Sequence, residues 1–217
     1  MTASRRAFVL RHTRLRSVPD LPHLRLHLAD DVLALWHATQ LETDDPDAPL
    51  PYWAFAWGGG LAIAHHLLID SGLVAGRRVL DLGAGSGLCA LAAAHAGASS
   101  VTALDIDPFA IAAIGLNARA AGRRVTAIER DVLDEPPPDV DMILAGDCWY
   151  EAGLATRVLP WLRQAVATGA DVLVGDPRRR YLPTTELEEI ATYEVRTTTE
   201  LEDLDRKHAG VYRLRAG

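Results

Sequence analysis

Short apolar runs recur along the chain from residue 77 to residue 176, separated by longer Ala/Leu-rich stretches. The runs are RRVLDL (77–82), SVTALD (100–105), RVTAIE (124–129), DMILAG (141–146) and DVLVGD (171–176). The stretches GLCALAAAHAG, PFAIAAIGLNARAAG and GLATRVLPWLRQAVATG, which lie between such runs, have the length and spacing of helices. Apolar strands that alternate with helices predict βαβ crossovers and a mainly parallel sheet covered by helices on both faces.

The two ends of the chain have a different pattern. ATYEVRTTT and KHAGVYRLR near the C-terminus resemble strands joined without a helix, which predicts an antiparallel end of the same sheet. Near the N-terminus LHLADDVLALWHATQ suits an amphipathic helix, and the loop TDDPDAPLPY follows it. With no internal repeat and no linker, we expect one α/β domain over residues 1–217. Its first part, 1–75, would be a helical extension, and 76–217 a Rossmann-like core.

Composition narrows the class of protein. The 217 residues are 49% hydrophobic, and no apolar run approaches the roughly 20 residues of a membrane helix. The net charge of −7 argues against nucleic acid as the main partner. Cys89 and Cys148 lack metal-site spacing, so we expect no metal and a reduced, cytoplasmic setting. The basic stretch MTASRRAFVLRHTRLRS could resemble an organellar presequence, but a basic surface segment of the domain is the preferred interpretation.

A glycine-rich turn follows the first run, in DLGAGSG. Gly83, Gly85 and Gly87 stand between a strand and a helix, where glycine permits a tight turn and close approach of backbone N–H groups to a ligand. The next run ends at Asp105, where a carboxylate can accept both hydroxyls of a ribose. Asp107 precedes Pro108, and we expect it to cap the next helix.

The residues around this turn indicate which class of ligand it binds. The dinucleotide fingerprint G-x-G-x-x-G/A requires Gly or Ala where this chain has Leu88, and Asp81 would place negative charge near a pyrophosphate. Asp81 suits a cationic ligand such as S-adenosylmethionine (SAM), which carries an ammonium and a sulfonium. The pattern resembles the seven-strand SAM-dependent methyltransferases, with DLGAGSG as their first motif and Asp105 as their ribose-binding acid. In that fold, the positions of Ile106 and Asp131 also contact the cofactor, Asp131 at the adenine amino group, although Asp131 could instead be a surface turn residue.

Several further motifs resemble one branch of that fold. PYWAFAWGGGLAIAHHLL, DIDPFAIAAIGLNA, GDCWYE and GDP occur together, in this order, in the lysine methyltransferases of the electron-transfer-flavoprotein β subunit and their bacterial relatives. The resemblance covers most of the chain from about residue 6. It implies that the segment with Trp53 and Trp57 covers the cofactor, with Trp57 near it. Trp53 could instead be an aromatic staple for the N-terminal helix. One departure is GDPRRR, where relatives have Gly after the Pro.

AGDCWYE follows the fourth run and could be a metal site, a cysteine nucleophile or a cup for a substrate group. Cys148 has no neighbouring His or second Cys, so we expect it to be a buried filler. The D-x-x-Y spacing of Asp147 and Tyr150 resembles the form found in the protein-lysine branch. Asp147 could orient a lysine ε-ammonium, and the Tyr150 ring could flank its nitrogen through cation–π attraction. His65 and His66 point about 100° apart on a helix and are expected to be core or surface histidines.

The resemblance therefore implies a SAM-dependent protein-lysine N-methyltransferase. Its leading substrate would be the electron-transfer-flavoprotein β subunit, with a ribosomal protein as a second possibility. The alternatives are a small-molecule N- or O-methyltransferase on the same fold, and a SAM-binding module that docks partners without chemistry. Arg178, Arg179 and Arg180 could dock an acidic surface of the substrate protein, or form a solvated basic turn.

Overall fold

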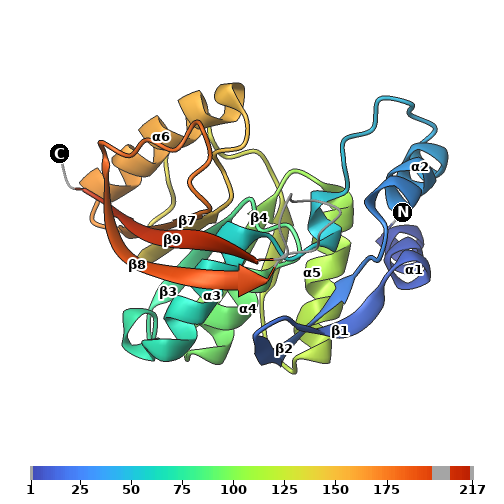
Figure 1. Ribbon diagram of the computed structural model, residues 1–217, viewed down its shortest axis with the longest axis horizontal. Helices are drawn as coiled ribbons and strands as arrows, with labels where there is room; N and C mark the ends of the chain where they lie inside the picture. Colours follow the sequence, from blue (N-terminus) through green and yellow to red (C-terminus); the bar gives the residue numbers. More distant parts are fainter. Residues whose placement is uncertain (1, 197–205, 216–217) are drawn as a thin grey trace.

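The computed structural model describes residues 2–196 and 206–215, and over these residues a seven-stranded sheet forms its centre (Figure 1). The strands lie in the order β5-β4-β3-β6-β7-β9-β8. Their bounds are β3 Arg78–Leu82, β4 Ser100–Asp105, β5 Thr126–Glu129, β6 Met142–Gly146, β7 Asp171–Asp176, β8 Leu187–Arg196 and β9 Arg206–Leu214. Strands β3 to β7 pair in parallel, whereas β9 is antiparallel to both β7 and β8. The predicted α/β fold with an antiparallel C-terminal end is confirmed.

Helices cover both faces of this sheet, as predicted. Helices α3 (Gly58–Ile69), α4 (Leu88–His95) and α5 (Pro108–Ala120) pack on one face, and α6 (Ala152–Ala167) covers the other (Figure 1). Successive side chains of a strand point to opposite faces. Val79 of β3 accordingly joins the core beneath α3 and α4, and Leu80 joins the core beneath α6.

The N-terminal part contains a β-hairpin, so the expectation of a wholly helical extension is wrong there. Its elements are α1 (Thr2–His12), β1 (Arg14–Val18), β2 (Leu21–Leu28), α2 (Val32–Thr43) and a 3₁₀ turn (Tyr52–Ala54). In β2 the buried Leu24 and Leu26 flank the exposed Arg25, which is the period of a strand with one buried face. Helix α2 begins only at Val32, because the Asp31 carboxylate accepts a hydrogen bond from Ala34 N and caps the helix there.

Helix α1 is fixed to the core by a separate apolar cluster. Phe8 and Val9 are fully buried against α5, and the Phe8 ring lies 4.9 Å from that of Phe109. Residues 2–12 of the basic N-terminal stretch therefore form a helix with one buried face, and the following residues enter β1. Within the part of the chain that the structure describes, no helix has the length and apolar character needed to cross a bilayer.

Candidate active site

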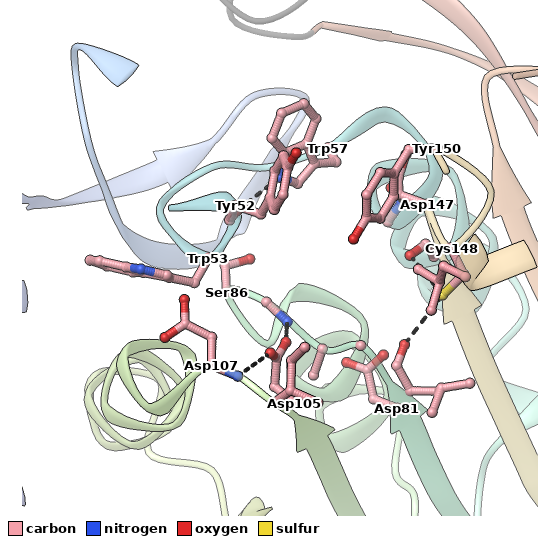
Figure 2. Close-up of a pocket in the computed structure, with 18 of the residues that line it drawn as sticks. Tyr52, Trp53, Trp57, Asp81, Ser86, Asp105, Asp107, Asp147, Cys148 and Tyr150 are labelled. Carbon is pink, nitrogen blue, oxygen red and sulfur yellow. Dashed lines mark hydrogen bonds between the residues drawn. The ribbon is translucent and has the colours of Figure 1, made fainter. Parts of the chain in front are cut away.

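A cavity of about 700 Å³ opens at the carboxyl ends of β3, β4 and β6. The chain runs from β3 through β4 to β5 on one side and then returns to β6 on the other side of β3, so the strand order reverses here. Ligands of open α/β sheets bind at such a point. The N-terminal segment 49–57 forms one wall of the cavity. Figure 2 shows Asp81 and Asp105 on one side of the opening and the aromatic residues Tyr52, Trp57 and Tyr150 opposite them.

The glycine turn and Asp105 form one unit on the floor of the cavity. Gly83, Gly85 and Gly87 all have φ between 52° and 78°, a conformation that residues with a Cβ rarely adopt. The turn brings Gly85 N to within 2.7 Å of Asp105 Oδ2, and Asp107 N lies 2.9 Å from Oδ1 (Figure 2). Each carboxylate oxygen therefore keeps a further lone pair, which is the acceptor pattern needed for two vicinal hydroxyls.

Asp81 and Asp107 each hold the start of a helix. Asp81 is buried, and its Oδ2 accepts a hydrogen bond of 2.9 Å from Ala90 N in the first turn of α4. Burial raises the pKa of Asp81 to about 7, so its charge is poorly solvated and a cationic ligand would favour the ionised form. Asp107 accepts from Phe109 N, which confirms that it caps α5.

The outer part of the cavity combines an apolar contact with a fixed carboxylate. Ile106 is 69% exposed and lines the cavity directly after Asp105, so its side chain is available to an apolar ring. Asp131 is an exposed lining residue whose two oxygens accept from Leu133 N and from Arg157. The Arg157 guanidinium lowers the pKa of Asp131.

Three aromatic side chains form the rim opposite the glycine turn. The Tyr52 ring lies 5.6 Å from that of Trp57 and 5.3 Å from that of Tyr150. Trp57 Nε1 donates to the Tyr52 carbonyl at 2.8 Å, which fixes the indole at the start of α3. Tyr150 is 46% exposed, and burial of the rest raises its pKa to about 12, so the phenol stays neutral. Tyr52 was not identified from the sequence, although it stands in the same PYWAFAW motif.

Trp53 points away from this rim. It is buried with Phe8 of α1, and its ring stacks on Phe109 of α5 at 6.2 Å. Although Trp53 also lines the cavity, its main contacts are those of an aromatic staple for the N-terminal helix. The two tryptophans of the motif therefore have separate positions, with Trp57 at the rim.

Asp147 makes contacts that its sequence position did not predict. Its Oδ1 accepts from Gly59 N at 3.0 Å and its Oδ2 accepts from Gly60 N at 2.7 Å. These are the second and third residues of α3, whose own N-cap residue Trp57 provides no side-chain hydrogen bond. Asp147 therefore supplies the N-cap of α3 from the end of a neighbouring strand, while still lining the cavity.

Arg179 lies beside Asp147, so the arginine run is not a uniform basic surface. The Arg179 guanidinium forms ion pairs with Asp147 and with the fully buried Asp176. Arg178 pairs with Glu189, and the Arg180 guanidinium lies over the Tyr181 ring. Of the two alternatives, a solvated basic turn is therefore wrong for Arg179, and docking of an acidic substrate surface by this run stays a prediction. The signal available in the sequence was its distance of three residues from the end of β7, at the same edge of the sheet.

The cysteines and histidines occupy structural positions. Cys89 and Cys148 are buried free thiols, and desolvation raises the pKa of both, which agrees with the filler interpretation of Cys148. His65 stacks on Tyr193 and His66 bonds to the Tyr193 hydroxyl, away from the cavity. Within residues 2–196 and 206–215, no three His, Cys, Asp or Glu side chains are grouped to hold a metal ion.

The fold matches known methyltransferases of solved structure. The chain aligns with the ribosomal protein L11 methylase of Lactobacillus delbrueckii subsp. bulgaricus at a TM-score of 0.53, with 22% identity over 79% of this chain and 83% of that one. It aligns with the magnesium protoporphyrin IX methyltransferase of Synechocystis, solved with SAM bound, at a TM-score of 0.51 and 16% identity, covering 72% and 78% of the two chains. At these identities the likeness establishes the fold.

Sequence comparison is more specific. Residues 66–146 match the family model for ribosomal protein L11 methyltransferase (PrmA). The chain is 38% identical over 176 residues to the electron transfer flavoprotein beta subunit lysine methyltransferase of Xenopus laevis, covering 80% of this chain and 70% of that protein. It is 30% identical over 210 residues to the Caenorhabditis elegans homolog of that enzyme, covering 88% and 83%. The chain therefore belongs to the family of electron transfer flavoprotein β-subunit lysine methyltransferases.

Proposed function

We propose that this chain transfers a methyl group from SAM to the ε-nitrogen of a lysine in a protein substrate. The observation that carries the proposal is the 38% identity, over 80% of this chain, to a relative named for that activity. The β subunit of electron transfer flavoprotein is the first candidate substrate, because the Xenopus laevis enzyme and its Caenorhabditis elegans homolog, 38% and 30% identical to this chain, are named for it. A ribosomal protein is the second, supported by the L11 methyltransferase match.

The residues that line the cavity fit SAM chemically. In our proposal the second lone pairs of the Asp105 carboxylate accept the ribose hydroxyls, and the Ile106 side chain packs on the adenine ring, with Asp131 near its amino group. The glycine turn at 83–87 and the buried Asp81 hold the charged amino-acid part. Trp57 covers the cofactor from the opposite side. When bound, SAM supplies a methyl group on a positively charged sulfur, ready for in-line displacement.

The chain's own residues would guide the acceptor. The Tyr52 and Tyr150 rings pack against each other with centroids 5.3 Å apart at the rim of the cavity that Asp147 also lines, and their exposed surface would contact an unbranched alkyl amine. Asp147 would orient the amine through its remaining acceptor capacity. Positioning then dominates the rate, because the nitrogen must approach to roughly 3–3.5 Å of the methyl carbon, in line with the sulfur.

The proposal also includes a role for segment 1–75 and a cellular location. Segment 1–75 would act as the cofactor-covering part of a single domain, since its residues 49–57 form a wall of the cavity. A cytoplasmic location is supported by the two buried free thiols, Cys89 and Cys148, which suit a reducing compartment.

The test uses purified protein, isotopically labelled SAM and two acceptors, namely recombinant electron transfer flavoprotein and a cell lysate. We expect label on the β subunit, at a lysine identified by mass spectrometry. Asp105→Ala removes both ribose acceptors and should weaken SAM binding more than tenfold by calorimetry. Exposed Asp47→Ala, in the loop after α2, is the matched control and should bind normally.

The outcomes separate the alternatives. Label on small molecules alone would establish the small-molecule methyltransferase instead. SAM binding without transfer to any acceptor would leave a docking module. Unchanged SAM affinity in Asp105→Ala would overturn the assignment of the cofactor site.

A further inference from the structure

We propose that Arg179 is a positioning residue that makes the acceptor lysine react as an uncharged amine, by placing a fixed positive charge on the carboxylate that receives it. This inference rests on the proposed function, since it concerns the same acceptor. It assigns a role to a residue outside the D-x-x-Y motif and reverses the expectation that Asp147 simply attracts an ammonium.

The loop after β7 holds the Arg179 guanidinium beside the Asp147 carboxylate. Arg179 N donates to Asp176 Oδ1 at 2.6 Å, and the side chain turns back to pair with Asp147 Oδ1, with Asp176 Oδ2 at 3.3 Å. Arg178, which precedes it, has a left-handed φ of 64° that makes this reversal possible. The Arg179 side chain is only 21% exposed and lines the cavity. The charge is therefore part of the site in the folded protein.

Asp147 has little unused capacity as an acceptor. A carboxylate offers about four lone-pair positions. Gly59 N and Arg179 occupy Oδ1, and Gly60 N occupies Oδ2. About one position therefore remains, on Oδ2, for an incoming amine. The positive end of α3 and the guanidinium already offset the carboxylate charge, so its attraction for a further cation is reduced.

An amine bound at that position stands beside a like charge. Two groups on one carboxylate lie within about 4–6 Å of each other, where a fixed cation disfavours the protonated form of its neighbour. An uncharged amine can donate one N–H to Oδ2 and keep its lone pair. After the proton has gone to solvent, that lone pair forms the new N–C bond while the C–S bond breaks and sulfur retains the electron pair.

Other titratable and charged groups lie near the acceptor site, and a test must separate their effect on the pH profile from that of Arg179. Asp176 opposes Arg179 from β7, and burial raises its pKa to about 6, so it is ionised in neutral solution. Asp81 of β3 and Asp105 of β4 lie across the cavity, Glu151 lies beside Tyr150, and Lys207 of β9 lines the wall. The phenols of Tyr52 and Tyr150 have raised pKa values and stay neutral, as do the two buried thiols. Arg179 forms an ion pair with the acceptor carboxylate, and Asp176 forms an ion pair with Arg179.

The experiment measures single-turnover methylation of recombinant electron transfer flavoprotein against pH, with saturating enzyme and SAM. For Arg179→Gln, whose amide can still donate to Asp147, we expect the acidic limb of the profile to move up by about one pH unit. The rate at pH 7 should then fall about tenfold and recover at high pH. Asp176→Asn removes the opposing charge and should move the limb down. Arg163→Gln, on α6 and paired with Glu186, loses the same charge outside the cavity lining and should match the wild type.

Each outcome decides the proposal. An unshifted limb in Arg179→Gln, or shifts of the same sign in Arg179→Gln and Asp176→Asn, would show that Arg179 only supports the structure. If Arg179→Gln fails to melt cooperatively, the direction of the Asp176→Asn shift decides alone, and no downward shift refutes the inference. A wild-type enzyme that methylates no protein refutes the proposed function itself, and this inference with it. A methylating wild type with unshifted variants refutes the inference only.

Discussion

Some carboxylates that line the cavity also accept hydrogen bonds from the first turn of a helix. Asp81 shows what this double role means for stability. Its side chain holds Ala90 N at the start of α4, yet it is buried where a charge is poorly solvated. Its pKa is raised from 3.8 to about 7 in the folded state. A raised carboxyl pKa means that stability is complete below the unfolded value and is lost as pH rises through the folded value.

Asp81→Asn should therefore stabilise the ligand-free protein at high pH. A shift of about three units corresponds to roughly 4 kcal/mol at pH 8, and the gain should shrink towards pH 4. The amide retains an acceptor for Ala90 N. In the variant, Asp107 and Asp176, each with a pKa raised to about 6, still make the free energy of unfolding fall with pH, but less steeply. Denaturant unfolding across this pH range provides the measurement, with exposed Asp47→Asn as control. Parallel curves for wild type and Asp81→Asn would contradict the buried-charge account.

At the scale of elements, strand ends cap the helices that pack on the sheet. Asp81, the second-last residue of β3, accepts a hydrogen bond from the start of α4, and Asp147, directly after β6, accepts two from the start of α3. The glycines at the start of α3 explain how that helix approaches so closely. A Cβ on Gly59 would lie 2.1 Å from Gly175 O, and one on Gly146 would lie 3.1 Å from Gly60 Cα. The glycines at residues 58–60 therefore allow the backbone of α3 to lie directly against the backbone of the sheet.

Gly59→Ala should be destabilising, because its methyl group would overlap the backbone of β7. Overpacking of this kind costs about 3 kcal/mol, and α3 should move away from the sheet. Gly58→Ala is the matched control, since its nearest contact would be Pro177 Cβ at an ordinary 3.7 Å. Its stability should stay equal to the wild type or rise slightly. Urea unfolding of both variants is the measurement, and equal midpoints would show that α3 does not pack this closely.

The same scale shows what could be predicted from the chain alone. The central strands were predicted to within two residues, because their apolar runs are continuous and bounded by turns. The hairpin of β1 and β2 was missed, since LPHLRLHL mixes apolar, basic and histidine positions whose burial depends on α5. A strand that is buried by one distant helix has a weak local pattern.

Across the whole molecule, the cavity joins segments that are far apart in the sequence. Residues such as Asp81, Asp105 and Asp147 could be predicted because parallel strands end at one edge of a sheet. The place of Tyr52 at the rim and the ion pair of Arg179 with Asp147 could not, because the paths of their loops depend on packing. The contacts of Asp147 with α3 were missed for the same reason, and because of these contacts we expect substitution of Asp147 to destabilise the folded protein.

Binding of S-adenosylhomocysteine should protect both parts of this cavity. At about 100 times its dissociation constant, a ligand of the native state adds roughly 2.7 kcal/mol of stability. Amide hydrogen exchange should slow in the wall 49–60 as well as in the glycine turn 83–88, because both line the same space. The turn 71–76 on the opposite edge is the internal control. Protection confined to the glycine turn would contradict a covering role for the N-terminal wall.

The attachment of Asp147 to α3 also limits how acceptor specificity can evolve or be redesigned. A substitution of Asp147 that changes which acceptor group the site binds also changes the cap of α3. A change in selectivity and a loss of stability therefore arise together. Helix α3 has no side-chain cap of its own at Trp57. A library that varies the cup should therefore first gain stability elsewhere, for instance at the exposed Leu41 and Ile69. Without that reserve, selection would recover mostly variants that retain the aspartate.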